Sequence, residues 1–156
     1  MRLTTRTNLA LRTLMACAVN KGRTLRTADI AQSCNASGNH LIQVVHLLQI
    51  NGFVETIRGR HGGIKLAMPD DKISIGNVIR ALESGIPFTE CFDSDQNSCP
   101  LVQECRLKAV LSRALEAFYA ELDKTSLADL VDDNCGLSDL LKIQDSFEKL
   151  CRESVI

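Results

Sequence analysis

Three cysteines lie close together in the segment ECFDSDQNSCPLVQECRLK at residues 90–108. Seven residues separate Cys91 from Cys99, five separate Cys99 from Cys105, and Pro100 stiffens the turn after the second cysteine. Thiolate ligands select soft metal centres, such as iron–sulfur clusters, zinc or copper(I), over hard cations. A loop of this length can curl so that three sulfurs point inward. The segment is therefore a candidate site for a soft metal centre, and three unrelated cysteines are the alternative.

The spacing of these cysteines also bears on the kind of metal. Zinc sites more often contain pairs of the C-x-x-C kind, and the sequence contains no such pair. The pattern is therefore less typical of zinc than of the other soft metal centres, and all three kinds stay open at this point.

The overall composition is that of an ordinary globular protein. The 156 residues are 45% hydrophobic and 24% charged, which suits one compact domain with an extension or two small domains. Neither a signal peptide nor a membrane-spanning run is evident, so we expect no membrane association. We therefore expect a cytoplasmic protein, in which clustered cysteines are metal ligands or redox sensors rather than disulfides.

The net charge of −1 conceals two halves of opposite sign. Residues 1–65 contain nine Lys and Arg against two Asp and Glu, a balance of +7. Residues 66–156 contain nine against seventeen, a balance of −8. A basic first half is typical of a surface that binds nucleic acid, and the acidic second half indicates a different role.

The basic half begins with a helix-turn-helix pattern. We expect helices at residues 3–19, 28–33 and 38–49, the second capped by Thr27 and the third by Ser37. Apolar residues of the third helix form one buried stripe: Leu41, Val44, Val45 and Leu48. The opposite side carries polar groups suited to base edges, as in a recognition helix.

A β-hairpin is predicted directly after the third helix. Residues 53–57 and 64–67 have the residue pattern of β-strands. The turn between them, RGRHGG, contains arginines, a histidine and glycines. A hairpin in this position is a wing. Its arginines suit the negative potential of a narrow minor groove, and its glycines allow close approach to a phosphate backbone.

The acidic half is predicted to be helical. Ser74 caps a helix at residues 75–83, and a long helix runs from Glu104 to Leu122 with apolar residues at three- and four-residue spacing. We interpret the long helix as a dimerisation helix, because one small neighbour cannot cover its apolar face. A short helix at 127–131 and an amphipathic tail follow. The expected regions are a winged helix-turn-helix domain at 1–68, a linking helix and cysteine loop at 69–103, and a dimerisation region at 104–156.

Enzyme signatures are missing from the sequence. There is no Gly-rich phosphate loop, no G-x-S-x-G motif and no H-E-x-x-H motif. The three histidines, His40, His46 and His61, fall in the expected reading helix and wing. We therefore expect a DNA-binding protein and not an enzyme.

Several segments together resemble the Rrf-type family of bacterial winged-helix regulators. They are MRLTTRTNLALR at the start, SGNHL at residues 37–41, VETIRGRHGG in the wing, ISIGNVIRALE, and the loop ECF…CPLVQECRLK. The resemblance implies a homodimer with an iron–sulfur cluster, [4Fe-4S] or [2Fe-2S], held in each subunit by Cys91, Cys99 and Cys105. The remaining cysteines match no family motif and are expected to be structural: Cys17, Cys34, Cys135 and Cys151.

One position departs from the family pattern. Family members that sense nitric oxide complete the cluster with an aspartate of the partner subunit, near the start of the first helix. The matching residue here is Asn8. An amide is a poorer iron ligand than a carboxylate, so Asn8 is expected to neighbour the fourth iron, with Glu90 or Glu104 as alternative ligands.

The sequence therefore predicts a repressor that binds a pseudo-palindromic double-stranded DNA operator and senses nitric oxide through its cluster. An iron-responsive repressor and a zinc-stapled DNA-binding dimer are the alternatives. The residues expected to contact DNA are Thr4, Thr5, Ser37, Asn39, His40, Gln43, Arg58, Arg60 and His61.

Overall fold

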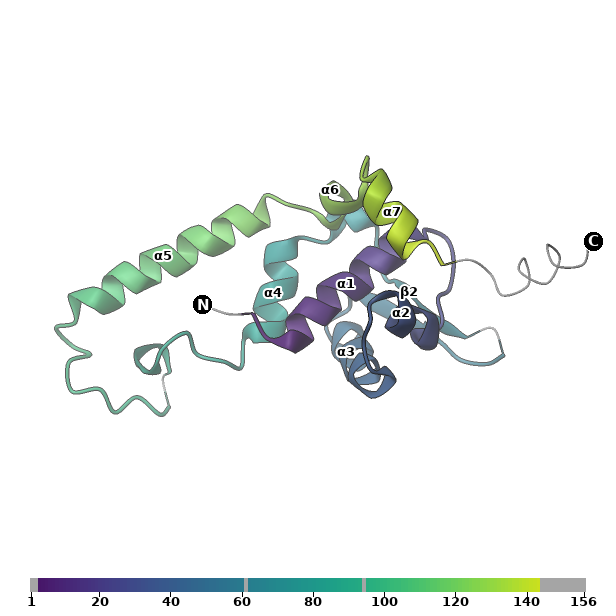
Figure 1. Ribbon diagram of the computed structural model, residues 1–156. Coiled ribbons are helices and arrows are strands. Elements are labelled where there is room, and N and C mark those ends of the chain that lie inside the picture. The colour runs from purple at the N-terminus through teal and green to yellow at the C-terminus, as the bar shows by residue number, and fades with distance from the viewer. Residues whose placement is uncertain (1–2, 61, 94, 144–156) are drawn as a thin grey trace, which may run out of the picture.

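The computed structural model describes residues 3–60, 62–93 and 95–143, and it is mainly helical with one small hairpin. The elements are shown in Figure 1 and run in the order α1 Thr5–Val19, α2 Thr27–Ser33, α3 Gly38–Ile50, β1 Val54–Ile57, β2 Gly63–Leu66, η1 Asp70–Lys72, α4 Ile75–Glu83, η2 Glu90–Phe92, α5 Arg106–Asp123, α6 Leu127–Val131 and α7 Cys135–Leu141. This architecture confirms the predicted fold class. No helix in these ranges is both long and apolar enough to cross a membrane.

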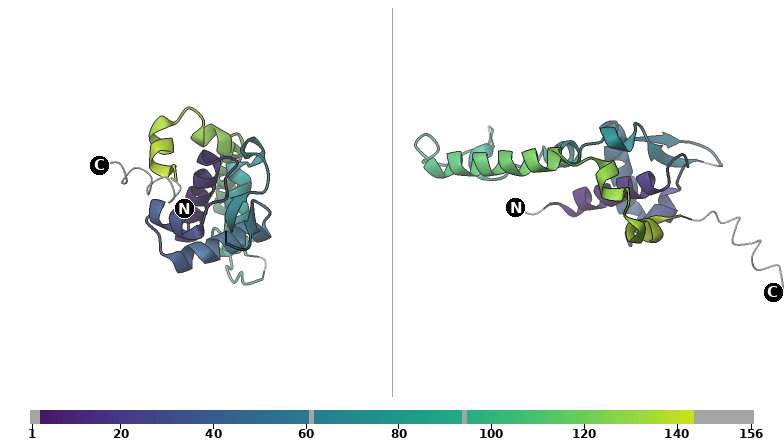
Figure 2. Two further views of the ribbon diagram at one scale, coloured as in Figure 1. Left: turned by 90° about the vertical axis from the view of Figure 1, so that its right-hand side faces the viewer. Right: turned by 90° about the horizontal axis from the view of Figure 1, so that it is seen from above.

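Helix α1 forms the centre of the packed body. It contacts α3, α4, α6, α7 and β2 (Figure 2). Small residues make this possible, because Ala10, Ala16 and Ala18 are at most 1% exposed and let the neighbouring backbones approach closely. Leu14 is fully buried among them. The burial of this one helix therefore fixes the positions of the elements around it.

The helix-turn-helix is formed by α2, a short turn and α3. Asn35 in the turn has φ 48°, a left-handed conformation that asparagine tolerates better than most residues. Ser37 caps α3 by accepting a hydrogen bond from the His40 N–H at 3.2 Å, as predicted. The capping residue of α2 is Arg26 and not Thr27, which lies inside the helix. Local sequence thus located the motif and missed one boundary.

The wing is an antiparallel pair in which Val54 lies opposite Leu66 and Ile57 opposite Gly63. Leu25, in the segment before α2, forms an isolated antiparallel bridge with Ile64 of β2. The two residues exchange two backbone hydrogen bonds of 2.8 Å. Gly59 at the tip has φ 107°, which an L side chain rarely adopts.

Helix α4 is joined to the end of α5 by a bidentate ion pair. Both guanidinium nitrogens of Arg80 donate to Asp123, each at 2.6 Å, and the guanidinium also lies 4.5 Å from the centre of the Tyr119 ring. A Cβ at Gly76 would collide with Asp123, so glycine is needed for this close approach. These contacts hold the end of α5 in a fixed orientation against α4.

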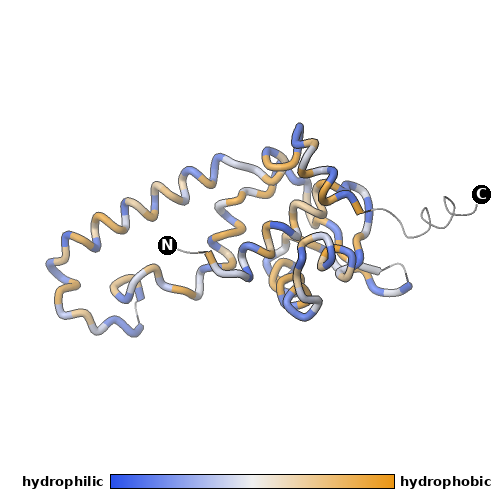
Figure 3. Tube along the Cα trace, viewed as in Figure 1, coloured by the Kyte–Doolittle hydropathy of each residue, from blue (hydrophilic) through white to orange (hydrophobic). Residues whose placement is uncertain are grey.

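The rest of α5 extends away from the body. The loop that contains the cysteines runs outward from α4 and leads into the far end of α5 (Figure 1). All residues of α5 are among those that the structure describes, and none of them is buried. Leu107 and Val110 are 62% and 50% exposed. Apolar residues recur along it in Figure 3. The helix begins at Arg106 rather than Glu104, because Cys105 is its N-cap and its sulfur accepts the Lys108 N–H at 3.4 Å.

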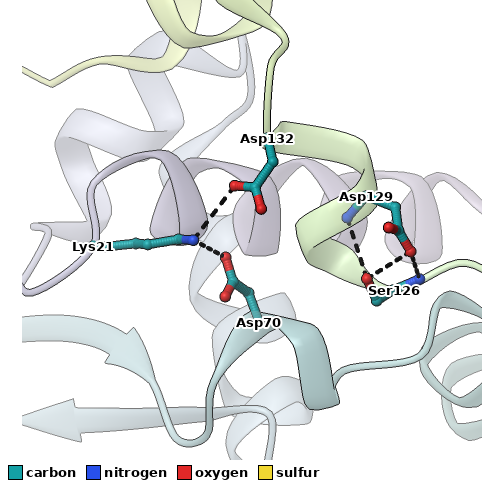
Figure 4. A network of polar contacts seen from close by, with 5 residues as sticks. All are labelled: Lys21, Asp70, Ser126, Asp129 and Asp132. Carbon is teal, nitrogen blue, oxygen red and sulfur yellow. Dashed lines mark hydrogen bonds and ion pairs between the residues drawn. The ribbon is translucent and has the colours of Figure 1, made fainter.

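Polar contacts attach the last helices to α1. Lys21 lies between Asp70 at 2.7 Å and Asp132 at 3.5 Å, and Ser126 and Asp129 form a capping box that starts α6 (Figure 4). The buried amide of Asn20 donates to the carbonyl of Leu141, which ties α7 to α1. The predicted amphipathic tail corresponds in part to α7. The remainder, including Cys151, lies outside the described residues.

Candidate DNA-binding surface and cysteine centre

One face of α3 is free for recognition. Ser37, Asn39, His40 and Gln43 are all exposed, while the predicted apolar stripe on the other face is buried in the core. Ser37 also serves as the cap of this helix. The side chains at 39, 40 and 43 carry amide and imidazole groups of the kind that hydrogen-bond to base edges in a major groove.

The start of α1 lies next to this face. A hollow of about 320 Å³ is lined by residues from both helices: Thr4, Thr5, Arg6, Leu9, His40, Gln43 and Val44. The structure therefore brings the predicted phosphate contacts Thr4 and Thr5 together with two predicted base-reading residues. It adds Arg6, an exposed cation that our sequence reasoning missed although it directly follows Thr5 in the basic half.

The wing tip presents further positive charge. Arg58 and Arg60 are exposed in the turn between β1 and β2. His61, also predicted to contact DNA, lies outside the described residues. These arginines therefore lie on a protrusion that is separate from the exposed face of α3.

Thr4 has a second role that its position in the sequence does not reveal. Its N–H and hydroxyl donate to Oε1 of Glu83 at 2.9 and 2.8 Å, and its hydroxyl also accepts the Thr7 N–H and so caps α1. Partial burial acts to raise the pKa of Glu83, but hydrogen bonds from Thr7 and Thr4, together with the Arg6 charge, hold that pKa below its usual value of 4.5. The end of α4 is thus bonded to the start of α1.

The three loop cysteines are free thiols, and each is half-buried. The Cys91 sulfur lies 3.1 Å from the Thr89 hydroxyl, and the Cys99 N–H donates to the Asn97 side chain at 3.1 Å. Cys105 is the N-cap of α5, and its sulfur accepts the Lys108 N–H. The donors therefore suit a soft metal centre by type and by accessibility.

The three loop cysteines have suitable chemistry for a metal site, but their side chains are not grouped into one. Among the residues that the structure describes, no three His, Cys, Asp or Glu side chains are grouped closely enough to hold a metal ion. The loop would have to contract for all three sulfurs to reach one metal centre. Asn8, the predicted neighbour of a fourth iron, is exposed on α1 and free to meet a second subunit.

The remaining cysteines differ in environment. Burial, and secondarily the nearby Cys34, raise the pKa of Cys17 to about 12. Burial also raises the pKa of Cys34, although the charge of Arg12 opposes the effect. These two thiols are therefore poor nucleophiles and ligands at neutral pH, which suits the structural role predicted for them. Cys135 is exposed at the start of α7.

Comparison with known proteins places this arrangement in a family. The sequence profile of the Rrf2 family, described as iron-dependent transcriptional regulators, matches residues 3–133. The chain belongs to the Rrf2 family. This confirms the resemblance that the motifs indicated, and it agrees with a regulator rather than an enzyme.

Individual Rrf2 relatives match along almost the whole chain. The HTH-type transcriptional regulator NsrR of Bacillus subtilis is 42% identical over 146 residues, 93% of this chain and 100% of the relative. NsrR of Geobacillus kaustophilus is 43% identical over 91% of this chain and 97% of its own. The solved structure of the global cysteine regulator CymR of B. subtilis aligns with TM-score 0.66 and 30% identity, covering 84% of this chain and 96% of that one. The chain is therefore a transcriptional regulator with DNA as its partner.

The Glu83 contact gives the first prediction. Because the folded pKa lies below 4.5, the ionised carboxylate stabilises the fold above about pH 4.5, and this contribution is lost as the pH falls through the lowered pKa. Glu83→Gln should lower the free energy of unfolding at neutral pH by roughly 1 kcal/mol, since solvent screens the partly exposed group. Thermal unfolding from about pH 3 to about pH 7 measures the effect.

The control is Asp139→Asn, which removes an exposed carboxylate from α7. It should unfold with the acid dependence of the unmodified protein. A Glu83→Gln protein whose deficit stays constant across the acid range would contradict the assignment.

Proposed function

We propose that this Rrf2 protein is a homodimeric repressor whose affinity for its operator is set by an iron–sulfur cluster on Cys91, Cys99 and Cys105, and that nitric oxide is its signal. The observation that carries the proposal is the position of the cysteine loop. The loop joins the end of α4 to the start of α5, and Glu83, the last residue of α4, is hydrogen-bonded to Thr4 at the start of α1. A change in the loop can therefore reach the DNA-facing surface.

Dimerisation is supported by the exposed face of α5. Its 18 residues span about 27 Å, and α4, with nine residues, contacts only part of that length. Leu107 and Val110 lie exposed on the same side as the partly exposed Leu111 and Phe118. A second copy of α5 would cover this face and give two recognition helices related by a two-fold axis, which suits a pseudo-palindromic operator.

Metal binding is supported by the donor set of three partly accessible thiols in the segment that joins α4 to α5. A bound cluster would supply iron, to which nitric oxide binds. Three cysteines leave one iron of a four-iron cluster without a thiolate, and Asn8 is a weak ligand for it. While they bind the metal, the three thiols hold the loop in one shape. When the metal is lost, the loop is free to change shape. A hundredfold change in operator affinity needs about 2.7 kcal/mol of coupling, within the range usual for allostery.

An iron-responsive repressor is the second candidate. The description of the family as iron-dependent favours it, and the same loosely completed cluster would be emptied by iron scarcity. The two candidates share every residue named above and differ only in the signal.

DNA binding by the wing can be tested with Arg58→Ala. Removing a guanidinium that enters a groove should weaken operator binding by about 1–3 kcal/mol at fixed salt. Fluorescence anisotropy with an operator fragment measures the affinity. Arg113→Ala, which removes the same charge from the polar side of α5, is the matched control and should bind normally. Equal affinities for the two variants would remove the wing from the interface.

Dimerisation can be tested with the double substitution Leu107→Glu and Val110→Glu. Both side chains are at least half exposed, so two carboxylates should leave the single subunit folded and repel a second apolar face. Light scattering should then report a monomer. Ala109→Glu with Ala120→Glu adds the same charge to exposed positions on the opposite side of the helix and should remain dimeric. A dimeric first variant would place the interface elsewhere.

The cluster and its signal can be tested together under anaerobic conditions. The reconstituted protein should be brown and bind operator DNA, and a few nitric oxide molecules per cluster should release the DNA. Cys99→Ser should retain neither iron and sulfide nor tight binding, because only two thiolate anchors remain. Cys135→Ser, the matched control, should behave like the unmodified protein. Visible absorbance and gel shift report the two properties.

Three other outcomes would decide against the proposal. Operator binding that survives nitric oxide but is lost with a ferrous chelator alone would establish the iron-responsive reading. A colourless protein with bound zinc would establish the zinc-stapled dimer. A brown Cys99→Ser protein would overturn the ligand assignment.

A further inference from the structure

The carboxylate of Glu90 links the two ends of the first half of the cysteine loop. Its Oε1 accepts hydrogen bonds from both the N–H and the hydroxyl of Ser98, at 2.9 and 2.6 Å. The two hydrogen bonds close a loop between residues eight positions apart. The link therefore ties one end of this part of the loop to the other through one side-chain oxygen.

Each of the linked residues directly precedes a cysteine. Cys91 follows Glu90 and Cys99 follows Ser98, and consecutive Cα atoms lie only about 3.8 Å apart. The contact between Glu90 and Ser98 therefore limits how far apart the two cysteine backbones can lie. The third cysteine is fixed separately, as the N-cap of α5.

Hydrogen bonds inside the closed loop support the same shape. Oδ1 of Asp93 accepts the N–H groups of Asp95 and Gln96 at 2.8 and 3.1 Å, and Oδ1 of Asn97 accepts the Cys99 N–H. Each bond joins a side chain to nearby backbone, so each bends the chain locally. Only the link from Glu90 to Ser98 spans the loop from one of these cysteines to the other among the contacts that the structure describes.

We propose that Glu90 is a positioning residue, which holds Cys91 and Cys99 as a pair before any metal binds. The inference rests on the proposed function, in which both thiols hold an iron–sulfur cluster. Holding the pair in advance removes part of the loop-closure entropy that binding would otherwise cost. In this proposal Glu90 uses Oε1 to hold Ser98 and acts through the cysteines, not as a ligand.

The test measures how readily the two thiols pair in the metal-free full-length chain. Cys105, Cys135 and Cys151 are replaced by serine, and the buried Cys17 and Cys34 remain. The protein is equilibrated with reduced and oxidised glutathione. One oxidised glutathione takes two electrons from the Cys91 and Cys99 thiols, which form a disulfide, and is released as two reduced glutathione molecules. The equilibrium constant, read from trapped thiols by mass spectrometry, reports the proximity of the pair.

We expect Glu90→Ala to lower this constant about tenfold, equivalent to about 1.4 kcal/mol. Ser98→Ala keeps the backbone N–H and should lower it less. The double variant should match Glu90→Ala alone, because both changes break one link. Ser98→Thr should restore pairing, and Glu90→Gln, which keeps the oxygen but not the charge, should fall between. Glu116→Ala, which removes an exposed carboxylate from α5, is the matched control and should not change the constant.

An unchanged constant in Glu90→Ala, or additive effects of the two alanine substitutions, would overturn the inference. So would iron loss in Glu90→Ala without a change in pairing, since that result would make Glu90 a ligand. Iron and sulfide analysis of the unmodified protein separates this question from the proposed function. A protein that holds no cluster but needs Glu90 for pairing would refute only the function. A protein that holds its cluster and pairs without Glu90 would refute only the positioning role.

Discussion

The burial of α1 is the constraint on which the other elements depend. Three alanines that are almost fully buried let five elements pack against one short helix. Interiors packed at this density respond to small displacements as a unit rather than deforming gradually. A shift of α1 would therefore move the recognition face of α3 and the wing with it. For a regulator this is useful, because one helix can transmit a change to every DNA-facing part.

Helix α4 connects that central helix to the outer half of the molecule through two polar contacts. Glu83 bonds to Thr4 at one end, and Arg80 bonds to Asp123 on α5. Partly exposed polar pairs add little to overall stability, so their main effect is on orientation. Breaking a contact of this strength costs a free energy similar to the coupling free energy of an allosteric switch. The cysteine loop begins directly beyond α4, where such an exchange would start.

Sequence reasoning succeeded where the signal is local. Ser37 and Ser74 cap the helices that they were expected to cap, and apolar periodicity located the buried stripe of α3 and the exposed face of α5. It missed contacts between distant segments. The bond from Glu83 to Thr4 joins residues 79 positions apart, and Leu25 joins the wing through a single residue. Neither leaves a pattern in the neighbouring sequence, since each depends on how the helices pack.

The cysteine loop shows that spacing can predict candidate ligands without specifying their geometry. Thiols in the core are held by packing, and their burial suppresses ionisation. The loop around the other three thiols is held by a few hydrogen bonds at exposed or partly buried positions, which cost little to rearrange. Binding of a soft metal releases far more free energy than such bonds contain. A loop of this kind can therefore leave its three sulfurs ungrouped without metal, contract around a metal centre, and relax again when the centre is lost.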